Sequence, residues 1–158
     1  MTETELRPNS VPWPPLIYVA AILLSVLLAY LVPLPWIGSP MSDILFAVGC
    51  VTVVMAVVME IAAMRALARH KTTIKPHQAS AHLVTDGPYA FTRNPIYLGN
   101  TMLMIGAGLI FGIVWLIGLA IAAAFATQKL AIEGEERHLD LRFTKRFRDY
   151  RKKVRRWI

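Results

Sequence analysis

Two polar segments carry the side chains of this chain that could bind a ligand or react. The first is LVTDGPYAFTRNPIYLG, residues 83–99, where aromatic and cationic groups crowd a predicted turn. The second is Glu135-Glu136, an adjacent pair of carboxylates. A plain connecting loop needs few such groups, whereas a pocket for a polar cofactor uses them for charge pairing and ring contacts. We therefore expect the first segment to form one wall of a cofactor pocket.

The carboxylate pair has two interpretations. On its own, Glu135-Glu136 is typical of a solvated helix start, where the helix dipole favours acidic side chains. Alternatively, one carboxylate binds an amino or hydroxyl group of a polar cofactor. The sequence contains no phosphate-binding loop, dinucleotide-binding glycine motif, CxxC, HExxH or Gly-x-Ser-x-Gly. No histidine pair has the spacing of a zinc site on a predicted helix, so we expect no metal.

The first polar segment also contains its own backbone signals. Asp86-Gly87-Pro88 predicts a turn, because glycine tolerates unusual φ values and proline fixes φ at about −65°. Asn94-Pro95 predicts a helix start, since proline suits the first helical turn and asparagine is a favourable N-cap residue. The segment therefore connects two helices.

The composition indicates a membrane protein. Of 158 residues, 56% are hydrophobic and 17% are charged, whereas soluble domains have about 45–50% apolar and about 25% charged residues. Residues 133–158 hold ten Lys and Arg against five Asp and Glu. Beside apolar runs, such a basic segment favours anionic lipid over nucleic acid as its partner. The single cysteine, Cys50, lies in an apolar run and is interpreted as a buried small hydrophobe.

The apolar runs are the elements that must position the polar segments. Residues 16–32 and 44–68 each suit a spanning helix of about 17–25 residues, and residues 72–95 form the cytosolic cofactor-binding loop. The run 96–130 is too long for one span, so we expect a tight helical hairpin that turns near Gly112. The fold class is therefore all-α: a single membrane domain with about four transmembrane helices.

The tail, residues 133–158, predicts an amphipathic interfacial helix. Its apolar side chains recur every three or four residues: Leu139, Phe143, Phe147, Tyr150, Val154 and Trp157. Such a helix anchors the chain at the membrane surface or packs over the site as a lid, and the sequence leaves both open. Four spans place both termini on one side, which the positive-inside rule makes cytoplasmic.

Other polar or small residues inside the apolar runs have more than one interpretation. Glu60 either emerges from the bilayer, which we favour, or faces the bundle interior, where a carboxylate is costly and usually functional. Several glycines of the hairpin would allow close helix contact: Gly99, Gly106, Gly108 and Gly118.

Three motifs follow one another along the second half of the chain. They are TTIKP, then HLVTDGPYAFTRNPIYLG, and after the predicted hairpin EGEERHLDLRFTKRFRDYRKKVRRWI. Together they resemble the isoprenylcysteine carboxyl methyltransferase family, within the wider set that includes the phospholipid methyltransferases. The resemblance covers about residue 72 to the end. Asn94 stands where eukaryotic members have His, as in the short prokaryotic type.

The resemblance implies an integral membrane methyltransferase that uses S-adenosyl-L-methionine and releases S-adenosyl-L-homocysteine, without a Rossmann domain. Glu135 would pair with the cofactor's ammonium group, and a tyrosine face would lie near its sulfonium. Arg93 is a candidate anchor for the cofactor's carboxylate or an anionic substrate group; no catalytic residue is assigned. The implied cofactor-binding residues are His82, Leu83, Val84, Tyr89, Asn94, Pro95, Ile96, Tyr97, Glu135 and Glu136.

We expect the methyl acceptor to carry a carboxylate or a thiol. Methyl transfer from a sulfonium needs alignment and desolvation more than acid–base groups. A phospholipid amine would have to be neutral, and the sequence offers no convincing base, so amine N-methylation is the alternative. A non-enzymatic scaffold or lipid-binding adaptor is the competing class. The expected partners are membrane lipids and a lipophilic or prenylated acceptor, in a prokaryotic cytoplasmic membrane.

Overall fold

The computed structural model describes residues 13–70 and 83–158. Within these ranges the regular elements are all helical, and the β-type pairing is one isolated bridge between Thr92 and Arg155. The elements are α1 (Trp13–Leu31), α2 (Met41–Arg69), the short 3₁₀ helix η2 (Gly87–Ala90), α3 (Pro95–Phe111), α4 (Val114–Thr127), the π-helical segment η3 (Gln128–Ile132) and α5 (Glu133–Lys153).

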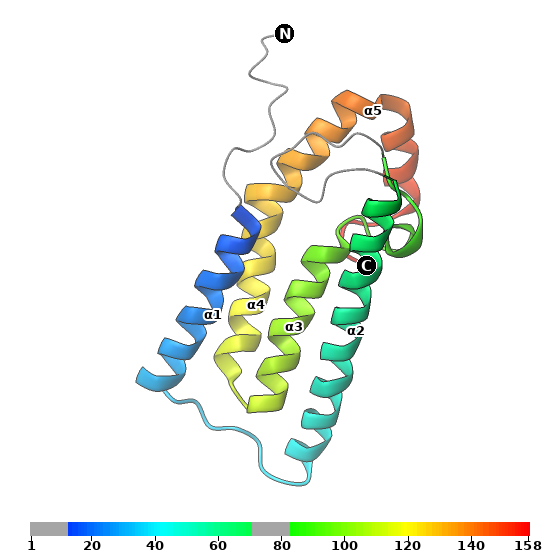
Figure 1. Cartoon of the computed structure of the whole chain (residues 1–158). Coiled ribbons are helices and arrows are strands. Elements are labelled where there is room, and N and C mark those ends of the chain that lie inside the picture. The colour runs from blue at the N-terminus through cyan, green and yellow to red at the C-terminus, as the bar shows by residue number, and fades with distance from the viewer. Residues whose placement is uncertain (1–12, 71–82) are drawn as a thin grey trace.

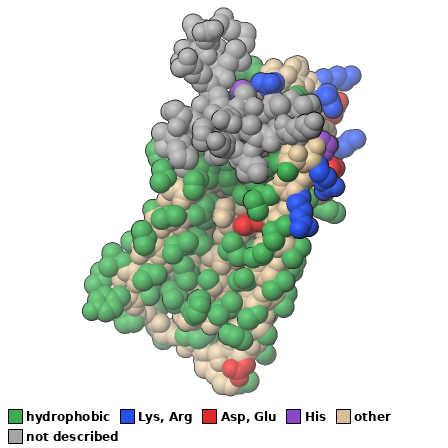
Figure 2. All heavy atoms as spheres, viewed as in Figure 1, with side chains coloured by type: hydrophobic (Ala, Val, Ile, Leu, Met, Phe, Trp, Pro, Cys, Tyr) green, Lys and Arg blue, Asp and Glu red, His purple; other side chains and the backbone are tan. Residues whose placement is uncertain are grey.

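Four apolar helices stand side by side and form a bundle (Figure 1). α3 packs between α2 and α4, and α4 also packs against α1. Hydrophobic side chains cover the outside of this bundle, and basic side chains gather at one end of it (Figure 2). A water-soluble monomer does not expose so much continuous apolar surface.

The described helices include three that are long and apolar enough to cross a membrane, judged by length and composition. They are α1, α2 and the continuous run Val114–Lys153, while α3 is shorter at 17 residues. α1 and α2 match the predicted spans 16–32 and 44–68, with earlier starts at Trp13 and Met41. The chain therefore has the build of an integral membrane protein.

The predicted helical hairpin is confirmed. α3 ends at Phe111, Gly112 adopts φ of 67°, and α4 begins at Val114. Only glycine takes this left-handed conformation at little cost, which is why the chain reverses at this residue.

Close helix contact depends on some of the predicted glycines. A Cβ at Gly106 would lie 2.7 Å from Val53 of α2, and a Cβ at Gly108 would lie 2.6 Å from Ile117 of α4. The prediction for Gly118 is wrong, because a Cβ there would meet nothing within 4 Å. Gly118 faces away from the neighbouring helices.

The tail departs from the single amphipathic helix that was predicted. α5 bends at Thr144, where φ is 42° and ψ is −108°, and it ends at Lys153 (Figure 1). Val154 and Trp157 therefore lie beyond the helix to which their spacing assigned them. The physical reason is that residues 154–158, which we call the strap, bond to the chain just before α3 instead of continuing the helical ladder.

Candidate functional site

Residues 83–94, which we call the turn segment, directly precede α3. The predicted turn is present: Gly87 adopts φ of 59° and Pro88 occupies the first turn of η2. The His70 ring lies 2.8 Å from the Asp86 carboxylate and ties the turn segment to the end of α2. The turn segment is therefore held on one side by α2.

α5 packs onto the other side of the turn segment. Phe147, Tyr150 and Val154 form a buried apolar cluster against which Leu83 packs. The Tyr150 hydroxyl donates a hydrogen bond of 2.6 Å to the carbonyl oxygen of Tyr89. The apolar stripe predicted from the tail thus packs inside the protein, against the segment that the sequence singled out.

The strap completes this arrangement with backbone contacts. The Arg93 N–H donates to the carbonyl of Arg155 at 3.0 Å. The carbonyl of Arg156 accepts two hydrogen bonds, from the Thr92 hydroxyl at 3.1 Å and from the Asn94 amide at 3.0 Å. The expectation that the Asn94 side chain caps α3 is therefore wrong, since its amide group bonds to the strap instead.

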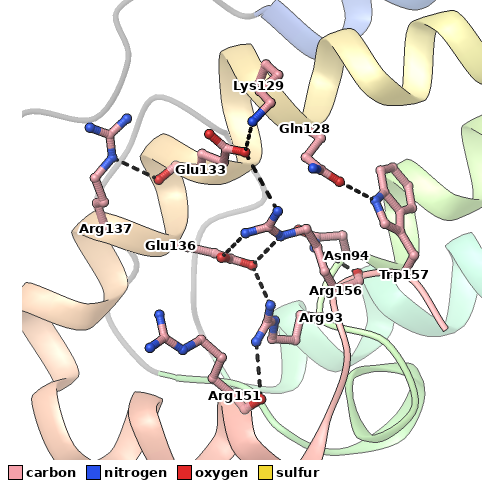
Figure 3. Close-up of polar contacts among 10 residues, drawn as sticks. All are labelled: Arg93, Asn94, Gln128, Lys129, Glu133, Glu136, Arg137, Arg151, Arg156 and Trp157. Carbon is pink, nitrogen blue, oxygen red and sulfur yellow. Dashed lines mark hydrogen bonds and ion pairs between the residues drawn. The ribbon is translucent and has the colours of Figure 1, made fainter.

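An ion cluster joins the turn segment, α5 and the strap (Figure 3). Glu136 is buried and accepts a fork of hydrogen bonds from Arg156, at 3.1 and 2.7 Å. It also pairs with Arg93 at 2.9 Å. Two guanidinium groups on one carboxylate satisfy the charge that burial would otherwise penalise. Glu136 and Arg93 therefore neutralise each other inside the protein.

Glu135, the neighbouring carboxylate, has different partners. The Tyr97 hydroxyl, from the first turns of α3, donates a 2.8 Å hydrogen bond to Glu135. No Lys, Arg or His in the part of the chain that the structure describes pairs with Glu135. Adjacent glutamates thus differ: Glu136 has two cations, and Glu135 has one neutral hydrogen-bond donor.

Burial around Glu135 alters the protonation of the groups there. Burial raises the pKa of Glu135, and the nearby Glu136 charge adds to this, while the Tyr97 hydrogen bond opposes it. Burial also raises the pKa of Tyr89, as do the nearby Tyr150 and the negative charge of Glu135. The Glu135 carboxyl is therefore one that an incoming cation would help to ionise.

His138 lies one turn after Glu135 on α5. Both of its ring nitrogens are buried without a hydrogen-bond partner among the described residues. Burial lowers the pKa of His138, and the charge of Arg142 lowers it further. Both effects favour the neutral form of the imidazole.

The structure brings most of the sequence-predicted site residues to one end of the bundle. Tyr89, Asn94 and Tyr97 lie on the turn segment and the start of α3, and Glu135 and Glu136 approach them from α5. Val84 and Pro95 are buried, while Leu83 and Ile96 are half-buried. The predicted residue His82 lies outside the described residues.

Sequence reasoning missed the strap and its contacts. Arg156 pairs with Glu136, and the Trp157 indole N–H donates to the Gln128 side chain at 2.8 Å. The tail held a regular apolar repeat that favoured one continuous helix, so nothing in it indicated where the helix would end. The ten Lys and Arg of the tail likewise gave no sign of which one would pair with Glu136.

These observations define a class of protein before any comparison: an apolar helical bundle with a polar, carboxylate-bearing site at one end. The sequence model of the phospholipid methyltransferase family matches residues 44–146. This match covers more than half of the chain, and it includes most of α2, all of α3 and α4, and the Glu135-Glu136 pair. The chain belongs to this family of membrane methyltransferases, which confirms the family resemblance inferred from its motifs. A search of curated proteins finds no match.

Proposed function

We propose that the protein transfers a methyl group from S-adenosyl-L-methionine to a lipophilic acceptor in the membrane. The observation that supports this most strongly is the contrast between Glu136, which two arginines neutralise, and Glu135, which has no cation among the described residues. A half-buried carboxylate of this kind fits a ligand that supplies its own ammonium group. The methyl donor has such a group.

The residues of the site fit the donor in their chemistry. Glu135 would bind the ammonium group, and Tyr97 would hold the Glu135 carboxyl in place through its 2.8 Å hydrogen bond. The rings of Tyr89 and Tyr97 offer faces that favour a sulfonium. When bound, the donor supplies a methyl carbon already activated by its positive sulfur. The protein's task is then to align that carbon with the acceptor and exclude water.

We propose a supporting role for Arg93 and Glu136. Because these side chains pair with each other, neither is free to bind the donor as the family resemblance implied. We propose that they fix the turn segment against α5, so that Tyr89 and Glu135 face one space. Asn94, whose amide bonds to the Arg156 carbonyl, belongs to the same support.

We also propose an orientation of the bundle in the membrane. We propose four spans, with α3 and α4 as the two short members of the hairpin, and with the site end facing the cytoplasm. The basic side chains of α5 and the strap gather at that end (Figure 2), as the positive-inside rule requires. The donor would enter from the cytosol and the acceptor laterally from the bilayer. The acceptor's methylated group is a carboxylate, a thiol or an amine.

The test is methyl transfer by the full chain in membranes supplied with labelled S-adenosyl-L-methionine. We expect label in a lipid-soluble product, and we expect Glu135→Gln to raise the KM for the donor by roughly tenfold to a hundredfold, the value of a charged hydrogen bond. Asp140→Asn is the matched control, because Asp140 lies on α5 and pairs with exposed Arg148. Wild-type membranes that label no product would support the adaptor class instead.

A further inference from the structure

Helix α1 buries one narrow face against the bundle, and that face carries two hydroxyl groups. Its buried residues are Pro14, Tyr18 and Ser25, which lie four and seven positions apart and so share one side of the helix. Elsewhere α1 exposes apolar side chains such as Leu23 and Val26. A buried hydroxyl is costly unless it forms hydrogen bonds, so both Tyr18 and Ser25 need partners.

Ser25 finds its partners away from the candidate site. Its hydroxyl lies 2.7 Å from the carbonyl oxygen of Ala21, one turn earlier in α1, and 3.3 Å from that of Trp115. Trp115 is in the first turn of α4, next to the turn of the α3–α4 hairpin. The Ser25 hydroxyl therefore joins α1 to α4 near the end of the bundle that is opposite the site.

The Tyr18 hydroxyl reaches the start of α3 instead. It lies 3.0 Å from the carbonyl oxygen of Tyr97 and 2.7 Å from the Thr101 hydroxyl, which itself lies 2.9 Å from the same carbonyl. Two hydroxyl protons thus serve three contacts, and each way of placing them gives the Tyr97 carbonyl at least one hydroxyl donor. Tyr18 is buried, so these contacts are shielded from water.

These contacts hold the residue that orients Glu135. The side-chain hydroxyl of Tyr97 donates the 2.8 Å hydrogen bond to the Glu135 carboxyl. The backbone of Tyr97 is held from the opposite direction, by Tyr18 of α1 and Thr101 of α3. Because the backbone position of Tyr97 decides where its hydroxyl lies, a shift in the first turn of α3 would also alter the contact with Glu135.

Helix α1 lies outside residues 44–146, the part of the chain that the family match covers. It begins at the end of the bundle where α3 begins and α4 ends (Figure 1). There α1 also contacts η3, the segment that leads into α5. The candidate site is therefore supported by a helix that carries none of the family's motifs.

We propose that Tyr18 is a positioning residue for the methyl donor. Its hydroxyl fixes the first turn of α3 and so holds Tyr97 where the Tyr97 hydroxyl bonds to Glu135. This inference rests on the proposed function and adds to it a residue of α1. Packing alone does not require the Tyr18 hydroxyl, because phenylalanine would fill the same space without a polar group to satisfy.

The experiment is isothermal titration of the full chain with S-adenosyl-L-homocysteine, for wild type, Tyr18→Phe, Tyr97→Phe and the double variant. We expect Tyr18→Phe to raise Kd by roughly threefold to tenfold, the strength of a neutral hydrogen bond. In the Tyr97→Phe background the hydrogen bond to Glu135 is already absent, so Tyr18→Phe should raise Kd by less than about twofold. A purely structural role would give the same change in both backgrounds.

Two further variants separate positioning from stability. Ser25→Ala is the matched control, because it removes the other buried hydroxyl of α1; it should lower the melting temperature and leave Kd unchanged. Thr101→Val replaces the second hydroxyl on the Tyr97 carbonyl with a methyl group of similar size. It should raise Kd as Tyr18→Phe does.

Three outcomes would overturn the proposal and leave the proposed function intact. They are an unchanged Kd in Tyr18→Phe, an equal change in Kd with and without the Tyr97 hydroxyl, or an equal rise in Kd in Ser25→Ala. A wild type that binds no S-adenosyl-L-homocysteine would refute the proposed function, and this inference with it.

Discussion

The hydroxyl of Tyr97 donates a 2.8 Å hydrogen bond to Glu135, although the two residues are 38 positions apart in the chain. Tyr97 stands in the first turns of α3, and Glu135 in the first turn of α5, so the contact closes the α3–α4 hairpin at its polar end. It places Glu135, which has no cationic partner within residues 13–70 and 83–158, beside the turn segment. Every proposal about the methyl donor depends on this pairing.

Binding of S-adenosyl-L-homocysteine should release a proton from Glu135. Burial raises the pKa of Glu135 in the free protein, and a bound ammonium favours its ionised form. Affinity should therefore fall by up to about tenfold per pH unit as the pH drops below that raised pKa. Tyr97, Tyr89 and Glu136 are the other groups that face it. Calorimetry in buffers of different protonation enthalpy measures the proton release, which Glu135→Gln should abolish.

Glu135→Gln should also stabilise the ligand-free protein near neutral pH. A carboxyl whose pKa is raised by folding contributes stability below its ordinary value of 4.5, and that stability is lost as the pH rises through the raised pKa. Glutamine keeps the hydrogen bond from Tyr97 without a charge to desolvate. The difference in melting temperature between variant and wild type should grow with pH from about 4.5 upward. A constant difference at all pH values would contradict this assignment.

Reversing the charge of Arg156 should break its ion pair with Glu136 and destabilise the protein. Arg156→Glu leaves like charges beside Glu136 in a buried cluster, and we expect a loss of about 3–5 kcal/mol in the free energy of unfolding. Adding Glu136→Arg would restore this pair but place a cation beside Arg93, so we expect only partial recovery. Reversal at exposed Arg155 is the control, and equal losses at both arginines would argue against the cluster.

Because α2 packs closely against α3, replacing Gly49 with a larger residue should destabilise the protein. Gly49→Ala puts a Cβ 2.8 Å from the backbone oxygen of Gly106, which cannot move aside without shifting a helix. We expect a loss of about 1–3 kcal/mol in the free energy of unfolding, typical of overpacking. Gly118→Ala, which meets nothing within 4 Å, should be neutral or stabilising. Similar melting temperatures for the two variants would contradict the contact.

The sequence was sufficient for elements whose signals are local. Charge-free runs predicted the apolar helices, Gly112 predicted the hairpin turn, and Pro95 predicted the start of α3, because each depends on burial or backbone conformation near one residue. The two polar segments were correctly expected to meet, because the hairpin between them brings their ends together.

The remainder depends on contacts between distant residues, which no local pattern contains. The strap is held by hydrogen bonds from Thr92 and Asn94 to the carbonyl of Arg156, more than sixty positions further along the chain. The opposite states of Glu135 and Glu136 depend on which guanidinium groups approach them. The sequence cannot distinguish Glu135 from Glu136, because the difference between them comes from residues far away in the chain.

Isothermal titration of the purified wild-type chain with S-adenosyl-L-homocysteine, beside Glu135→Gln and Asp140→Asn, tests the central claim most directly. The account predicts saturable binding to the wild type and to Asp140→Asn, with Glu135→Gln roughly tenfold to a hundredfold weaker. Equal affinities in all three proteins, or no binding to the wild type, would contradict it.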